Sequence, residues 1–287
     1  MEFVFYYYTP SAAAGGIFAG LFGVFTLVHI YQLTRTKTWF MIPFAIGGAL
    51  ETVGYIGRVL SFTEAPDFTQ GPYVMQSALI LIAPAFLAAS IYMILGRIIT
   101  MLDAERCSII RLRFLTKIFV TGDVLSFLMQ ASGAGIMVKD ENSAETGEKI
   151  IVGGLFVQII FFACFVITAA VFEFRMAKQR VPVSPELTSI WRRHMLALCF
   201  TSVLILVRSI IRVVEYLMGY DSYMMKQEVF IYVFDAMLMF IVLFTLNWVH
   251  PSEVNSAIGR GEKYFKRIFG VRKVGTVSRE MEEDRRV

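Results

Sequence analysis

Residues 150–172 read IIVGGLFVQIIFFACFVITAAVF, a run of 23 residues without a single charged side chain. An α-helix rises about 1.5 Å per residue, so about 20 apolar residues cross the roughly 30 Å hydrocarbon layer of a bilayer. Charged residues bound the run, with Lys149 before it and Glu173 after it. The run therefore predicts a transmembrane helix.

Six further stretches have comparable length and apolarity, so the sequence predicts seven transmembrane helices. We place them near Ala12–Leu33, Trp39–Leu60, Tyr73–Thr100, Leu115–Val138, Ile150–Phe172, Met195–Leu217 and Val229–Val249. Of the 287 residues 56% are hydrophobic and only 17% are charged, with a mean hydropathy of +0.63. An ordinary soluble domain does not bury that much apolar surface. The predicted fold is an all-α membrane protein, a bundle of seven transmembrane helices.

The positions of Lys and Arg predict how the bundle is oriented, because cytosolic loops of membrane proteins retain positive charge. The odd-numbered connections and the segment after His250 hold 21 Lys and Arg residues, against three in the even-numbered connections. We therefore expect a short external N-terminus (1–11), a transmembrane domain (12–250) and a basic cytosolic tail (251–287). Within the tail, Val254–Phe269 is predicted to lie on the anionic inner leaflet as a basic amphipathic helix.

Small residues and one proline predict how the helices pack. Gly16 and Gly20 in the first helix, and Gly133 and Gly135 in the fourth, are expected to allow close approach of helix backbones. Pro84 is expected to kink the third helix, because it lacks a backbone N–H.

Ionisable side chains inside the predicted helices need an explanation, since each costs about 2.5–3.5 kcal/mol to insert at the centre of a membrane helix. In the second helix, Glu51, Tyr55 and Arg58 share one face because they are spaced i, i+4, i+7. Every helix after the first contributes a polar side chain, ionisable or amide, and we expect the set to line a ligand or translocation cavity that opens outward and narrows inward. The set is Glu51, Tyr55, Arg58, Gln76, Asp123, Gln130, Gln158, Arg208, Arg212, Glu215 and Asp235.

The same residues have a second interpretation, in which three acids neutralise three arginines inside a closed bundle. The acids are Glu51, Glu215 and Asp235, and the arginines are Arg58, Arg208 and Arg212. Three glutamines accompany these charges, which exceeds what bundle stability requires and favours the cavity. The two interpretations are compatible with each other.

Two histidines fall near the cytosolic ends of the first and seventh helices. His29 and His250 are expected to come close enough to touch, and Asp123 is a candidate third member of the group. Three such ligands would suit an intramembrane metal-dependent lipid hydrolase, which is one alternative function. We place the third histidine of the chain, His194, in a loop, so we prefer interfacial hydrogen bonding and expect neither a metal nor another cofactor. Motifs for a nucleophile, a zinc protease or a phosphate loop are absent, so we expect no enzyme.

Short motifs along the chain occur in an order typical of one protein family. They are Tyr8-Thr9-Pro10-Ser11, His29, Glu51-x-x-Gly54-Tyr55-x-x-Arg58, Gln76-Ser77, Ala83-Pro84, Tyr92-x-x-x-Gly96-Arg97, Asp123-x-x-Ser126-x-x-x-Gln130-x-x-Gly133, Gly154-Leu155-x-x-Gln158, Arg208-x-x-x-Arg212-x-x-Glu215, Asp235 and His250-Pro251. With these motifs the chain resembles, over nearly its whole length, the fungal RTA-like proteins, also called lipid-translocating exporters. The residues that stand out by insertion cost also carry the motifs.

The resemblance implies a multi-pass membrane protein that exports or translocates amphiphiles and confers resistance to toxic ones, such as sphingoid long-chain bases and aminosterols. We expect it in the plasma membrane, with an endomembrane as the alternative location. The implied partners are membrane lipids; nucleic acid is not expected, a cytosolic partner is undefined, and an oligomer is compatible with the sequence. A seven-helix receptor or sensor of membrane lipids fits the same topology and stays open as an alternative.

Overall fold

The structure is a computed structural model that describes residues 10–65, 68–137, 141–179, 184–218, 227–261, 263–265, 268 and 270–273. Several features used above lie outside the described residues. They are Tyr8 and Thr9 of the first motif, Val138, most of the predicted external N-terminus and residues 274–287 of the tail.

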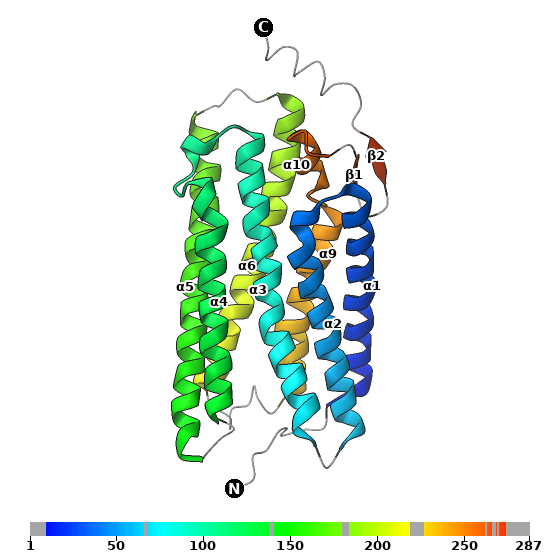
Figure 1. The fold of residues 1–287 in the computed structure, drawn as a ribbon, viewed down its shortest axis with the longest axis vertical. Helices are drawn as coiled ribbons and strands as arrows, with labels where there is room; N and C mark the ends of the chain where they lie inside the picture. Colours follow the sequence, from blue (N-terminus) through cyan, green and yellow to red (C-terminus); the bar gives the residue numbers. More distant parts are fainter. Residues whose placement is uncertain are drawn as a thin grey trace.

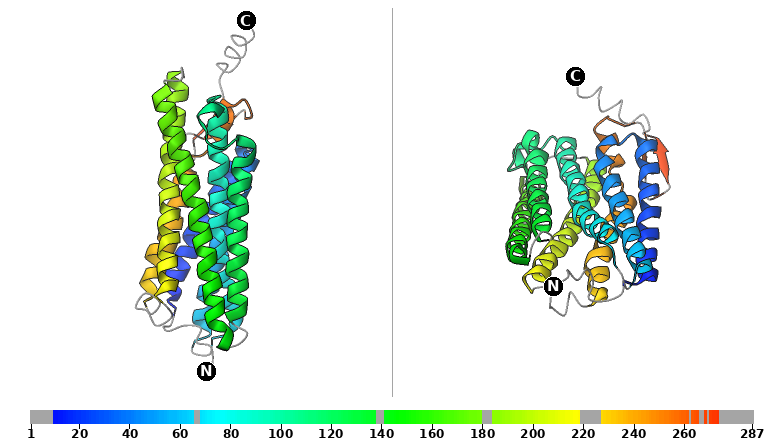
Figure 2. Two further views of the ribbon diagram at one scale, coloured as in Figure 1. Left: turned by 90° about the vertical axis from the view of Figure 1, so that its left-hand side faces the viewer. Right: turned by 60° about the horizontal axis from the view of Figure 1, so that its bottom comes forward.

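Long helices form an elongated bundle, with α4 and α5 beside each other on one side and α1, α2 and α9 on the other (Figure 1). The elements are α1 (Ala12–Thr36), η1 (Trp39–Met41), α2 (Ile42–Thr63), α3 (Gln70–Met101), η2 (Glu105–Cys107), α4 (Leu112–Met137), α5 (Glu141–Gln179), α6 (Pro185–Leu217), α8 (Glu228–Ile231), η3 (Tyr232–Ala236), α9 (Met237–Trp248), α10 (Ser252–Ala257), β1 (Lys263–Phe265) and β2 (Val271–Lys273). The segments α8, η3 and α9 follow one another as a single interrupted helix, so the described residues contain seven long helical segments. Figure 2 shows that all of them run along the long axis of the molecule.

Six of the seven long segments are long and apolar enough to cross a membrane. The segment that is not among these six within the described residues is α4, which carries the charged residues Arg113, Lys117 and Asp123. Large apolar side chains such as Leu27 and Leu196 face outward, while many polar side chains are buried inside. This distribution is the reverse of a soluble protein's and suits hydrocarbon as the surrounding solvent. The chain is an all-α membrane protein.

Two helix pairs, α4 with α5 and α2 with α3, have the most extensive contacts. Gly133 is required in the first pair, since a Cβ atom there would lie 2.6 Å from a backbone carbonyl oxygen of α5. The prediction for Gly133 is confirmed. The predictions for Gly135, Gly16 and Gly20 are wrong for the described residues, among which a Cβ at any of the three would meet nothing within 4 Å.

The described part of the tail folds back onto one end of the bundle instead of forming the predicted amphipathic helix. The helix α10 ends before Gly259, whose φ of 77° is a left-handed conformation that commonly terminates helices. The chain then enters β1, which pairs antiparallel with β2 close to the end of α1 (Figure 1). Phe265 of β1 is buried, and its backbone N–H donates to the hydroxyl of Ser252 at 3.0 Å. The prediction of a helix over Val254–Phe269 is therefore wrong.

Candidate functional site

A central cluster lies midway along the bundle and consists of Glu51, Tyr55, Arg208 and Asp235. Arg208 of α6 and Asp235 of η3 form a buried ion pair. Glu51 of α2 interacts electrostatically with both members of this pair and is only 1% exposed. Neither carboxyl oxygen of Glu51 has a hydrogen-bond partner among the described residues.

Two backbone irregularities lie beside the central cluster. Asp235 lies in the π-helical turn η3, and such turns are rare and often occur at functional sites. In α3, Pro84 lacks an N–H, so the carbonyl of Ile80 four residues earlier has no donor from its own helix. Arg208 supplies that donor from Nη2 at 3.0 Å.

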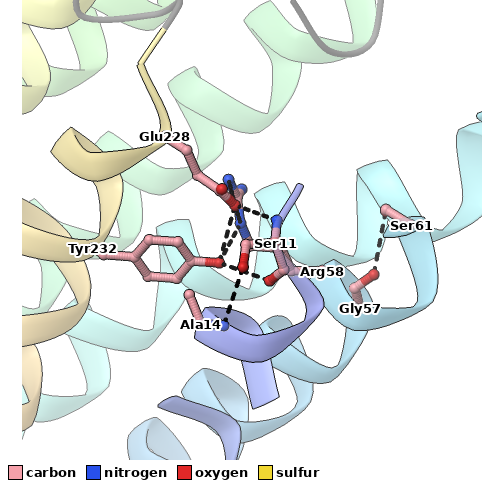
Figure 3. A network of polar contacts seen from close by, with 7 residues as sticks. All are labelled: Ser11, Ala14, Gly57, Arg58, Ser61, Glu228 and Tyr232. Atoms are coloured by element: carbon pink, nitrogen blue, oxygen red, sulfur yellow. Dashed lines mark hydrogen bonds and ion pairs between the residues drawn. The ribbon is translucent and has the colours of Figure 1, made fainter. Parts of the chain in front are cut away.

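An outer cluster joins the start of α1 to α2 and α8, and consists of Ser11, Arg58, Glu228 and Tyr232 (Figure 3). Arg58 donates to one carboxylate oxygen of Glu228 from Nη2 at 2.9 Å and from Nε at 3.2 Å. The backbone N–H of Ser11 donates to the same oxygen at 2.7 Å, and the hydroxyl of Tyr232 does so at 3.1 Å. One carboxylate therefore holds three helical segments together.

The arginine pairs agree in part with the closed-bundle interpretation. Arg208 pairs with Asp235, and Arg212 pairs with Glu215 at 2.9 Å on the same helix. Arg58 instead pairs with Glu228, a residue outside the predicted set. The carboxyl group of Glu51 therefore has no hydrogen-bonded arginine among the described residues. Gln76, also predicted, is buried on α3.

A lateral cluster connects α3, α4 and α5, and consists of Tyr92, Asp123, Ser126, Gln130 and Gln158. The hydroxyl of Tyr92 donates to Oδ2 of Asp123 at 2.9 Å. Gln130 donates from Nε2 to the hydroxyl of Ser126 at 2.7 Å and to Oε1 of Gln158 at 3.3 Å. Oδ1 of Asp123 and Oε1 of Gln130 have no hydrogen-bond partner in the described parts of the chain.

Two adjoining hollows open along this cluster, at the side of the bundle. The larger is about 140 Å³, and the smaller is about 10 Å³. The larger is lined by Ile82, Ala85, Phe86, Ala89, Val120, Asp123, Val124 and Phe127. The smaller is lined by Leu81, Ala85, Asp123, Ser126, Phe127, Gln130 and Gln158. The sequence predicts a cavity opening along the bundle axis, whereas these hollows open sideways between α3 and α4.

The three histidines of the chain lie at the end of the bundle that carries the tail. Nδ1 of His29 donates to the amide oxygen Oδ1 of Asn247 at 2.8 Å, and the ring centroid of His29 lies 5.3 Å from that of His250. The predicted contact between His29 and His250 is therefore confirmed. His194 reaches the carbonyl oxygen of His250 from Nε2 at 3.3 Å. Its predicted loop position is wrong, because α6 begins as early as Pro185.

Asp123 does not join the histidines, since it is hydrogen-bonded to Tyr92 in the lateral cluster. Within the described residues, no three His, Cys, Asp or Glu side chains gather as a metal site would require. The hydrolase interpretation therefore receives no ligand set from this part of the chain.

Two residues of the outer cluster carry a pattern that the sequence interpretation missed. Glu228, Tyr232 and Asp235 are spaced i, i+4, i+7, which repeats the spacing of Glu51, Tyr55 and Arg58 in the second helix. This repeated spacing was the available signal for Glu228. Asn247, which contacts His29, has no comparable pattern around it.

Comparison with known proteins adds independent information. The family model described as "RTA1 like protein" matches residues 44–257. The chain is 39% identical over 276 residues to Protoporphyrin uptake protein 1 of Saccharomyces cerevisiae, covering 84% of this chain and 90% of that protein. It is 36% identical over 266 residues to Protein RTA1 of the same yeast, covering 84% and 83%. It is 27% identical over 266 residues to the yeast Sphingoid long-chain base transporter RSB1, covering 80% and 69%.

No solved structure matches this chain. The matched family segment contains the central and lateral clusters, together with Arg58, Glu228 and Tyr232 of the outer cluster. Two of the relatives are named for uptake or transport, which links the chain to membrane transport in general. The resemblance stated from the motifs is confirmed, and the chain belongs to the RTA1-like family of membrane proteins.

Proposed function

We propose that this protein moves amphiphiles with a cationic head group, sphingoid long-chain bases among them, through or out of the bilayer, and that it is not an enzyme. In this proposal all seven long segments cross the plasma membrane, with the N-terminus outside and the tail in the cytosol. The observation that carries the proposal is the position of Asp123 in an apolar hollow at the side of the bundle.

The larger hollow has the chemistry that an amphiphile requires. Its walls include Phe86, Val124 and Phe127, and Val124 is 51% exposed at the surface that the lipid would cover. Asp123 also lines the hollow, is 4% exposed, and has one carboxylate oxygen without a hydrogen bond in the described chain. An alkyl tail can stay among the apolar walls while an ammonium group binds the carboxylate through charge-assisted hydrogen bonds.

A row of polar groups continues from Asp123 along α4. Ser126 and Gln130 follow at i+3 and i+7, so the three side chains share one face of the helix. Seven residues of helix cover about 10 Å, or roughly a third of the hydrocarbon thickness. We infer that the head group moves along this row while its tail remains in lipid. The smaller hollow holds only about one water molecule, so α3 and α4 must separate to admit a head group.

The charges of the bundle favour a cationic cargo over an anionic one. Arg58, Arg208 and Arg212 are each paired with a carboxylate. A cargo such as protoporphyrin, whose ionisable groups are carboxylic acids, would have to displace one of these partners. A base that carries an ammonium group meets the carboxylate oxygen of Asp123 that lacks a hydrogen bond. The relative named as a sphingoid long-chain base transporter supports this choice.

Substitution of Asp123 tests the proposal. Cells with equal surface levels of each variant are loaded with a fluorescent long-chain base, or with the matching probe in which a hydroxyl replaces the amine. We expect Asp123→Asn to lower efflux of the base about tenfold, because a hydrogen bond to a charged group contributes about 1.5–3 kcal/mol. Efflux of the alcohol probe should change little.

Tyr92→Phe is the matched control, since it removes the hydrogen bond to Asp123 and keeps the carboxylate. Its effect on base efflux should be small. Undiminished base efflux in Asp123→Asn, or an equal loss for both probes, would contradict a cationic head-group site at Asp123.

A further inference from the structure

The central cluster contains two acids and one arginine. Glu51 and Asp235 would both carry a negative charge when ionised, and Arg208 supplies one positive charge. Arg212 also interacts electrostatically with Glu51, but it is itself paired with Glu215. Ionised as a whole, the cluster has one excess negative charge. Burial of an unpaired charge is costly, so the cluster is stabilised by one added positive charge.

Several polar atoms of the central cluster lack partners within the described residues. Both carboxyl oxygens of Glu51, Oδ2 of Asp235 and the hydroxyl of Tyr55 are buried without hydrogen bonds. Tyr55 is fully buried and interacts electrostatically with both acids. A buried polar group without a partner destabilises the fold, so a ligand that contacts several of these atoms is favoured. The groups that interact with Glu51 are Tyr55 of α2, Arg208 and Arg212 of α6, and Asp235 of η3.

We propose that Glu51 and Asp235, together with the hydroxyl of Tyr55, form a site for one monovalent cation, either a proton or a sodium ion. The site takes up a single cation because one positive charge balances the cluster. It lies apart from Asp123, which belongs to the lateral cluster.

Arg208 connects this cation site to the hollow that contains Asp123. Its guanidinium pairs with Asp235 and also donates to the carbonyl of Ile80, which Pro84 leaves without a donor from α3. The residues just beyond that carbonyl, Ile82 and Ala85, line the larger hollow. A cation beside Asp235 weakens the hold of that carboxylate on Arg208. The change reaches the part of α3 around Pro84 through the same guanidinium, and in this way cation binding controls the separation of α3 and α4.

The coupling between the two sites rests on the proposed transport of amphiphiles, but the cation site can be tested without any cargo. The thermal unfolding midpoint of the purified protein in detergent is measured in two titrations. In the first, the sodium concentration is varied at fixed pH. In the second, the pH is varied without sodium, with N-methylglucamine as the only cation besides the proton. A ligand that binds only the folded state raises the midpoint, by about 3 °C for each tenfold rise in its concentration above its dissociation constant. The response to sodium or to protons identifies the cation.

Glu51→Gln keeps the shape of the side chain and removes its charge, so the response to the cation should disappear. Glu173→Gln is the matched control, because Glu173 is an exposed acid on α5 and its loss should leave the response unchanged. If the wild type and Glu51→Gln respond equally, or if neither responds, the cation site does not exist.

Tyr55→Phe covers the case in which Glu51→Gln does not fold. The phenyl ring can still stack on Phe22, whose centroid lies 5.6 Å from that of Tyr55, and only the hydroxyl is lost. We expect about tenfold more cation to be needed for the same midpoint, which corresponds to one lost hydrogen bond of about 1–1.5 kcal/mol. An unchanged cation dependence in this variant would remove Tyr55 from the site.

Transport in proteoliposomes separates the cation site from the amphiphile site. Glu51→Gln should exchange a fluorescent long-chain base across the membrane but should not accumulate it in response to a cation gradient. Asp123→Asn should lose both activities and keep the cation-dependent midpoint. If Glu51→Gln accumulates the long-chain base in response to a cation gradient as well as the wild type does, the proposed coupling between the cation site and the amphiphile site is wrong. The proposed transport of the base would not be affected by that result.

Discussion

Arg208 donates a hydrogen bond of 3.0 Å to the carbonyl oxygen of Ile80, the carbonyl that Pro84 leaves without a donor from its own helix. The same guanidinium pairs with Asp235 in the π-helical turn of the last long segment. One side chain of α6 therefore contacts both a carbonyl freed by a proline in α3 and an acid of the π-helical turn η3.

Pro84→Ala should make Arg208 less important for stability. The substitution restores an N–H that can donate to the carbonyl of Ile80. We expect Arg208→Gln to lower the free energy of unfolding by about 3 kcal/mol, since it leaves Asp235 unpaired, and by about 1 kcal/mol less when combined with Pro84→Ala. Unfolding of the four proteins in detergent measures this coupling, and strictly additive effects would show that the Ile80 contact contributes nothing.

Glu228→Gln should loosen the outer cluster more than Tyr232→Phe does. Glu228 accepts hydrogen bonds from Arg58, Ser11 and Tyr232, whereas loss of the Tyr232 hydroxyl keeps the ion pair between Arg58 and Glu228. We expect losses of about 2 kcal/mol and about 1 kcal/mol in the free energy of unfolding, respectively. Equal losses in the two variants would mean that the ion pair between Arg58 and Glu228 contributes no more to stability than the hydrogen bond from Tyr232 does.

Gly133→Ala should separate α4 from α5, while Gly135→Ala should be tolerated. A Cβ at Gly133 would lie 2.6 Å from a backbone carbonyl oxygen of α5, which cannot move as a flexible side chain can. Overpacking of this kind costs about 1–3 kcal/mol. Unfolding midpoints of the two variants test the difference, and a stable Gly133→Ala would mean that the helices can shift apart without penalty.

Ala89→Trp should obstruct the larger hollow and lower efflux of a long-chain base several-fold. Ala89 lines that hollow between α3 and α4. Ala131→Trp is the matched control, because Ala131 is an exposed residue of α4 that lines neither hollow. Efflux from cells at equal surface expression provides the comparison, and normal efflux by Ala89→Trp would place the path of the amphiphile elsewhere.

Phe265→Ala should release the tail from the end of the bundle. The ring of Phe265 is buried and lies 6.0 Å from those of Tyr31 and His250. Without it, trypsin should cleave after Arg260 and Lys263 faster than in the wild type, since cleavage requires local opening. Tyr264→Ala, at the adjacent half-buried position, should have a smaller effect. Equal cleavage rates in all three proteins would contradict this role of Phe265.

The spacing of polar residues predicted which side chains share a helix face better than it predicted which residues they contact. Glu51, Tyr55 and Arg58 were expected on one buried face of a helix, and all three are buried. The acid that pairs with Arg58 is set by how far the segment formed by α8, η3 and α9 extends beside α2. The sequence of α2 contains no information about the position of that segment. The answer, Glu228, lies 170 positions away in the chain.

The sequence by itself determined the helices and their membrane character, because hydrocarbon tolerates only apolar, internally hydrogen-bonded segments, and both properties are local in the chain. It also determined which polar residues needed an explanation, through their insertion cost. Only the tertiary structure decided that these residues divide into outer, central and lateral clusters, that Glu51 is an acid without a hydrogen bond in the part of the chain described, and that the hollow opens sideways at Asp123. These features depend on the rotation and depth at which each helix packs against distant helices, and the apolar pattern of a single helix leaves both of these variables free.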